Sequence, residues 1–124
     1  MPASIEINHP HPGDIVGGAV EVNVSWDLDL GAVPPNTDGQ VECLDADGAE
    51  IDDNGAPVTA QPFAVATVTG SASVTFTFAE SHDNIQFKAS LRINGIVNAA
   101  TDTSEGIEVE MSALVAAGAT ITIA

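Results

Sequence analysis

The sequence of 124 residues has very little positive charge. It contains two basic residues, Lys88 and Arg92, against 18 Asp and Glu residues, which gives a formal net charge of -16. A protein that binds nucleic acid uses cationic side chains to neutralise phosphates, so this composition argues against nucleic acid as a partner. An anionic membrane surface would repel the chain for the same reason.

Cysteine and long apolar runs are also scarce. Cys43 is the single cysteine, so no disulfide can form within the chain. The longest apolar run, Ser112 to Ala119, is too short to cross a bilayer, and Met1 to Ser4 show no basic or apolar signal region. We therefore expect a chain that is made in the cytoplasm and is not inserted into a membrane.

Strict alternation of apolar and polar residues is the most frequent pattern in the sequence. From Ala19 to Leu30, valine, tryptophan and leucine occupy the even positions and mostly polar residues the odd ones. Ile85 to Asn94 and Ile107 to Met111 alternate in the same way. A period of two is typical of a strand with one face on a core and the other in water. Trp26 falls on the predicted inner face of the longest run.

Turn-forming residues separate these runs from further short strands. One hairpin is predicted from Phe63–Val68 and Ser73–Ala79, and the stretch before Ile107 is predicted to be a polar loop. Roughly seven to nine strands with frequent turn signals predict an all-β fold, an antiparallel β-sandwich.

The length of the chain suits a single domain over residues 1–124, because a chain of this size buries roughly two-thirds of its unfolded surface. Residues 112–124 exceed what such a sandwich needs. They are predicted to form either one more strand or a tail that contacts another subunit.

The first strands carry a family resemblance. An isoleucine-rich segment (Ser4–Asn8), a Pro-Gly turn followed by Val-Gly-Gly (Pro12–Gly18) and an alternating valine strand (Val20–Val24) resemble the start of prokaryotic and viral immunoglobulin-like domains. The resemblance implies an immunoglobulin-like topology. The chain departs from the pattern because it has no cysteine pair and no tyrosine, so no binding residue is carried over.

The adjacent residues Ser81, His82 and Asp83 are of the types found in a hydrolase triad. Side chains of consecutive residues cannot line up in one relay, so a polar turn is the simpler interpretation and we expect no enzymatic activity.

Two groups of residues are candidate metal ligands. Histidines two positions apart share one face of an extended segment, so His9 and His11, with His82, could hold zinc, although Pro10 and Pro12 alone explain a rigid bend there. Calcium prefers oxygen ligands, and a solvated hairpin turn is the alternative interpretation for the acidic candidates. These calcium candidates are Asp45, Asp47, Glu50, Asp52 and Asp53.

The two basic residues are predicted to lie on the outward face of one strand. We expect them to pair with Glu108 and Glu110 on the next strand, because opposite charges across neighbouring strands fix their register. Docking of this face on an acidic partner is the alternative.

The function expected from these features is structural. An immunoglobulin-like domain without an export signal suits a virion surface protein that is made in the host cytoplasm, such as a capsid decoration protein of a tailed virus. The acidic composition is typical of proteins from halophilic hosts, and an ordinary acidic surface protein of a marine or mesophilic source is the alternative interpretation. The expected partners of the virion protein are capsid or other virion proteins and further copies of itself in a homo-oligomer. A cell-surface adhesion or glycan-binding module and a viral tail or fibre subunit are the alternatives.

The excess of negative charge predicts that stability depends on salt. Repulsion among like charges weakens the fold at low ionic strength, and a Debye length of about 3 Å at about 1 M salt removes most of it. The melting temperature should therefore rise between about 0.05 M and 1 M NaCl, measured by circular dichroism. A flat or falling melting temperature would contradict this prediction.

Overall fold

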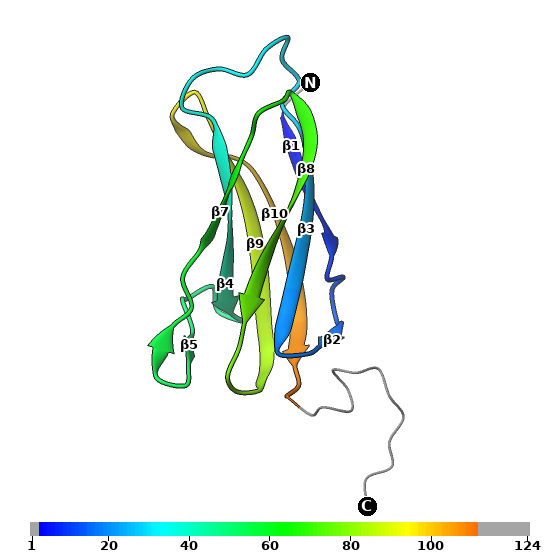
Figure 1. Cartoon of the computed structure of the whole chain (residues 1–124), viewed down its shortest axis with the longest axis vertical. Helices are drawn as coiled ribbons and strands as arrows, with labels where there is room; N and C mark the ends of the chain where they lie inside the picture. Colours follow the sequence, from blue (N-terminus) through cyan, green and yellow to red (C-terminus); the bar gives the residue numbers. More distant parts are fainter. Residues whose placement is uncertain (1–2, 112–124) are drawn as a thin grey trace, which may run out of the picture.

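The structure, a computed structural model, describes residues 3–111 and contains no helix in that range, hence none long and apolar enough to cross a membrane (Figure 1). The predicted strand or tail at 112–124 lies outside the described residues. The strands are β1 (Ser4–His9), β2 (Ile15–Val16), β3 (Ala19–Asp27), β4 (Asp38–Asp45), β5 (Asp52–Asp53), β6 (Ala56–Pro57), β7 (Gln61–Ala64), β8 (Thr69–Thr77), β9 (His82–Ile93) and β10 (Ile96–Val109).

Two sheets pack face to face along the long axis of the molecule (Figure 1). One has three strands in the order β1-β3-β8, and the other has five in the order β2-β10-β9-β4-β7. All neighbours are antiparallel except β2 and β10, which run parallel. The predicted immunoglobulin-like β-sandwich is thus confirmed, with the small β5–β6 hairpin outside the two main sheets.

The alternating residues of β3 and β9 form the centre of the core, as their period predicts. Val22 and Val24 of β3 and Phe87 and Leu91 of β9 are at most 1% exposed. The rings of Phe76 on β8 and Phe87 on β9 have centroids 5.2 Å apart, so they join the two sheets directly.

Trp26, near the end of β3, packs against β7 at the edge of the wider sheet. Its ring stacks on Phe63 of β7, with centroids 5.5 Å apart, and its indole N–H donates to the Thr67 carbonyl over 3.0 Å. Glycines make room for both rings: a Cβ on Gly39 would overlap the Phe63 ring, and one on Gly70 would lie 2.8 Å from Trp26 Cζ2. These four residues form one packing unit.

The chain crosses from the narrow sheet to the wide one between β1 and β2, and this crossover is fixed to β10. The Ser104 hydroxyl donates to the Pro10 carbonyl, the Gly13 N–H donates to the Glu105 carbonyl over 2.9 Å, and the Glu108 N–H donates to the Asp14 carbonyl over 3.0 Å. The crossover therefore closes one side of the sandwich.

Two expectations for the strands were wrong. The segments Phe63–Val68 and Ser73–Ala79 do not form a hairpin, because β7 pairs with β4 in one sheet and β8 pairs with β3 in the other. The polar stretch before Ile107 is not a loop but most of β10, which pairs with β9. Side chains at Ile96 to Ala99 are exposed throughout, so the alternation that identifies a half-buried strand is lost there.

Replacement of Trp26 by Ala should destabilise the protein by about 3–5 kcal/mol, because it leaves a cavity over Phe63 and removes the bond to Thr67. Glu21→Ala, on the exposed face of the same strand, should change stability by less than about 0.5 kcal/mol. Urea unfolding followed by circular dichroism measures both. Equal effects at the two positions would contradict the inward placement of the tryptophan.

Candidate functional site

Asp53 is a carboxylate with three hydrogen-bonding partners. Its oxygens accept hydrogen bonds from the Ala79 N–H at 2.6 Å and the Glu80 N–H at 3.2 Å, and lie 2.8 Å from His82 Nε2. The Glu80 carboxylate in turn accepts the N–H of Asn54 over 2.7 Å. These bonds fasten the β5–β6 hairpin to the turn between β8 and β9, and we call Asp53, Glu80 and His82 the hairpin clasp.

The clasp is electrostatically consistent with an ionised Asp53. Partial burial would raise the pKa of this carboxyl, but the N–H groups of Ala79 and Glu80 and the His82 ring outweigh that effect and hold the pKa below its ordinary value. Burial, with a smaller contribution from the Asp53 charge, raises the pKa of the Cys43 thiol to about 12. Cys43 is therefore a buried apolar residue, without the thiolate that a nucleophile needs.

The calcium candidates are not gathered into one site. Asp45 Oδ1 accepts the N–H groups of Asp47 and Ala49, at 2.8 and 3.0 Å, which fixes the turn after β4. Of the five candidates, Asp53 alone joins a group of three potential ligands, and its companions are Glu80 and His82.

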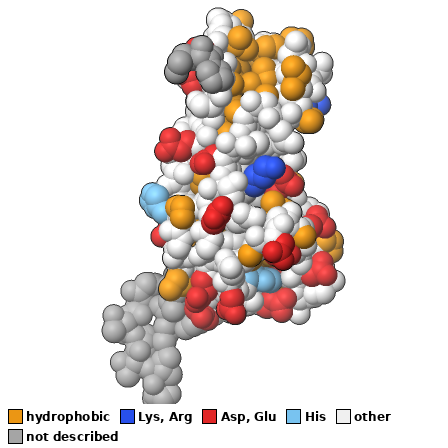
Figure 2. All heavy atoms as spheres, turned by 180° about the vertical axis from the view of Figure 1, so that it is seen from behind, with side chains coloured by type: hydrophobic (Ala, Val, Ile, Leu, Met, Phe, Trp, Pro, Cys, Tyr) orange, Lys and Arg blue, Asp and Glu red, His pale blue; other side chains and the backbone are white. Residues whose placement is uncertain are grey.

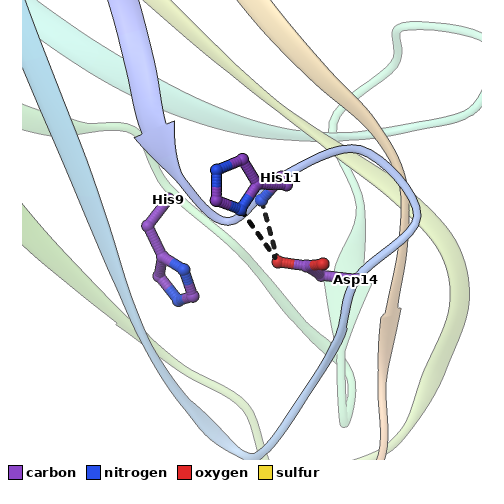
Figure 3. A group of neighbouring side chains, drawn as sticks. All are labelled: His9, His11 and Asp14. Carbon is purple, nitrogen blue, oxygen red and sulfur yellow. Dashed lines mark hydrogen bonds and ion pairs between the residues drawn. The ribbon is translucent and has the colours of Figure 1, made fainter.

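The zinc candidates are divided between two places. His82 belongs to the hairpin clasp, whereas His9 and His11 lie at the crossover with Asp14 (Figure 3). The His11 N–H donates to Asp14 Oδ2 over 2.9 Å, and His11 Nδ1 lies 3.8 Å from the same oxygen. Asp14 was not among the predicted zinc ligands, although its position three residues after His11 was the available signal.

Ser81, His82 and Asp83 do not form a relay. The Ser81 hydroxyl accepts the Met111 N–H over 3.0 Å, and the His82 ring is directed to Asp53. The neighbouring residues thus have separate structural partners.

The expected pairing of the basic residues with Glu108 and Glu110 was wrong. Arg92 forms a bidentate ion pair with Asp38 of β4, and Lys88 lies opposite Glu42 of the same strand. Register explains the difference, because Val109 on β10 lies opposite His82, at the far end of β9 from Arg92. The acidic partner strand is β4, on the other side of β9.

One end of the molecule exposes apolar side chains. Ile96 and Val97 are 65% and 68% exposed, directly after the β9–β10 turn. The Gly95 N–H donates to the Asn36 carbonyl over 2.9 Å, which brings the exposed Pro35 to the same turn. Val97 also lines a hollow with the exposed Pro62. We call Pro35, Pro62, Ile96 and Val97 the apolar end. Figure 2, which views the molecule from behind, shows hydrophobic side chains gathered at this end.

The hollow beside the apolar end has a volume of about 360 Å³. Polar side chains line it on the outer face of the wide sheet, among them Gln40, Arg92 and Asn98. Among residues 3–111, no aromatic ring, histidine or cysteine lines it.

No protein-family model matches the sequence, and no curated protein matches it. Among solved structures, the chain is similar to the CARDB domain of a Pyrococcus furiosus protein, whose crystal structure is in complex with di-metal ions. The identity is 14%, the alignment covers 88% of this chain and 93% of that chain, and the TM-score is 0.46. The assignment of the fold rests on the strand order and the packing of the two sheets.

Asp53→Asn should destabilise the protein by about 1–3 kcal/mol at pH 7, because an amide cannot accept all three bonds of the clasp. A carboxyl whose pKa is lower in the folded state stabilises the fold above its unfolded pKa of about 3.9, and this contribution disappears as the pH falls through the folded pKa. The difference between wild type and variant should therefore be largest near neutral pH and shrink below about pH 4. Asp52→Asn, at the exposed neighbouring position, serves as the control in urea unfolding at several pH values. A penalty that is equal in both variants, or that does not shrink in acid, would contradict the role of the clasp.

Proposed function

We propose that this protein is a non-enzymatic structural protein of a virion surface, a capsid decoration protein of a tailed virus that binds its neighbours through the apolar end. The exposure of Ile96 and Val97 is the observation that supports this proposal most directly. Large apolar side chains that gather at one end of a folded domain are typical of a surface that binds another protein.

The distribution of charge supports a protein partner of a particular kind. On the face shown in Figure 2, most acidic side chains lie away from the apolar end. A partner can therefore approach this end with less like-charge repulsion than elsewhere on that face. Copies of a chain with a net charge of -16 repel each other, so we propose a capsid subunit with an apolar contact surface and a neutral or basic rim as the partner.

The contacts of the polar clusters support a structural role. His82 is bonded to Asp53, and Ser81 accepts a backbone N–H, so neither is arranged as a base beside a nucleophile. The Cys43 thiol is buried within the core.

The hollow beside the apolar end favours a glycan-binding module as the second candidate. Gln40, Arg92 and Asn98 offer amide and guanidinium groups that suit sugar hydroxyls. The described residues of the lining offer no aromatic ring on which a sugar could stack, so we prefer the capsid partner.

The proposal is tested by cosedimentation of the purified protein with capsids assembled from the capsid protein of the same genome. Wild type should bind, and Val97→Asp should weaken binding at least tenfold. A charge in the centre of an apolar contact costs about 2 kcal/mol or more of binding free energy. Ile15→Asp is the matched control, because Ile15 is 58% exposed on β2, outside the apolar end.

Failure of the wild type to bind, or equal loss in both variants, would contradict the proposal. Sedimentation velocity of the free protein, at low and high salt, measures self-association separately. Self-association that is lost in Val97→Asp, without capsid binding by the wild type, would assign the apolar end to a homo-oligomer instead.

A further inference from the structure

We propose that His9, His11 and Asp14 form a binding site for a zinc ion at the crossover between the two sheets. Figure 3 shows the three side chains at the chain bend, where dashed lines join His11 to Asp14; His9 lies at the end of β1 and Asp14 just before β2. The potential ligand atoms all lie within 4.8 Å of one another. The proposal is independent of the partner that the apolar end binds.

The donor set suits a transition metal ion. Two imidazole nitrogens and one carboxylate oxygen are ligands that zinc accepts readily, with a water molecule in the fourth position. Calcium and magnesium prefer a shell of oxygen atoms, so two histidines select against them. The set thus discriminates between the metal ions that the acidic surface attracts.

The distances require only small adjustments. With metal–ligand bonds of about 2.0–2.1 Å, neighbouring ligand atoms of a tetrahedral site lie about 3.4 Å apart. His11 Nδ1 already lies 3.8 Å from Asp14 Oδ2, and the centroids of the two imidazole rings are 6.4 Å apart. His9 and His11 are exposed, so rotation of their side chains can close the remaining gap without any change in the core.

The backbone beneath the site is already held in place. The Asp14 N–H donates to the His11 carbonyl over 3.1 Å, and β10 binds the crossover at Pro10, Gly13 and Asp14. The peptide chain is already fixed, while the ligand side chains remain accessible to solvent. Zinc binding would therefore have only a small entropic cost for ordering the loop.

A zinc ion at this position would connect the two sheets. His9 pairs with Asn23 in the narrow sheet, and the residue after Asp14 pairs with β10 in the wide sheet. Since the metal would bind the folded crossover better than the unfolded chain, it would stabilise the sandwich. The hairpin clasp is the competing site, but its Asp53 carboxylate accepts two N–H groups and contacts the His82 ring, whereas the Asp14 carboxylate accepts one N–H, that of His11.

The test is isothermal titration of the metal-free full chain with ZnCl₂, alongside its melting temperature. We expect one zinc ion per chain, a melting temperature several degrees higher at saturation, and no comparable binding of CaCl₂. His11→Gln and Asp14→Asn should each lower zinc affinity at least about tenfold. Glu80→Gln in the hairpin clasp is the matched control and should leave zinc affinity unchanged.

Absence of saturable zinc binding by the wild type would overturn the proposal. So would zinc binding that survives both crossover substitutions, or that is lost in Glu80→Gln alone. Imidazole nitrogen NMR of the wild type gives an answer that does not depend on the folding of any variant. Zinc should shift the ring signals of His9 and His11 and spare those of His82, and the reverse pattern would place the ion in the clasp.

Discussion

The structure depends on how a sheet of three strands covers a sheet of five. β7 lies at one edge of the wide sheet, and β8, at the edge of the narrow sheet, packs against it. Trp26 extends from the end of β3 and stacks on Phe63, and Gly39 and Gly70 leave the space that the two rings require. The two stacked rings thus fill the space between the sheets, and their burial couples the sheets at this end.

The other side of the sandwich is closed by the crossover and not by a ring. There the chain leaves the narrow sheet after His9 and joins the wide sheet at Ile15, held by hydrogen bonds from β10. Hydrogen bonds fix the path of the chain, and the buried Pro10 adds apolar packing beneath it. This is the side on which the proposed zinc ion would add a link between polar side chains.

The sequence predicts the fold wherever one face of a strand is buried and the other is wet. The inner residues of β3 and β9 follow directly from their alternation, and so does the placement of Trp26. Alternation says nothing about which strand pairs with which, and this is why β7 and β8 were wrongly joined in a hairpin. Alternation also fails at the start of β10. Both faces of the strand are exposed there, so no buried apolar face produces a period of two in the sequence.

The candidate sites were predictable only where their residues are close in sequence. His9 and His11 are neighbours in the chain, and the fold adds Asp14 to them through a local turn. The pairing of Asp53 with His82 spans 29 positions and depends on how the β5–β6 hairpin folds back, which composition does not encode. The same limit applies to Arg92, whose partner is set by the order β10-β9-β4 and not by its own strand.

The placement of charge connects the fold to its proposed partner. Arg92 and its partner Asp38 line the same hollow as Val97, so an ion pair lies beside the apolar end. A charge that is already paired costs less to cover than a free carboxylate, because its partner replaces part of the water that a protein contact removes. A free carboxylate in that position would oppose every approach of an apolar surface. The ion pair therefore lowers the desolvation cost of covering the apolar end with a partner. Elsewhere on this acidic chain, unpaired carboxylates raise that cost.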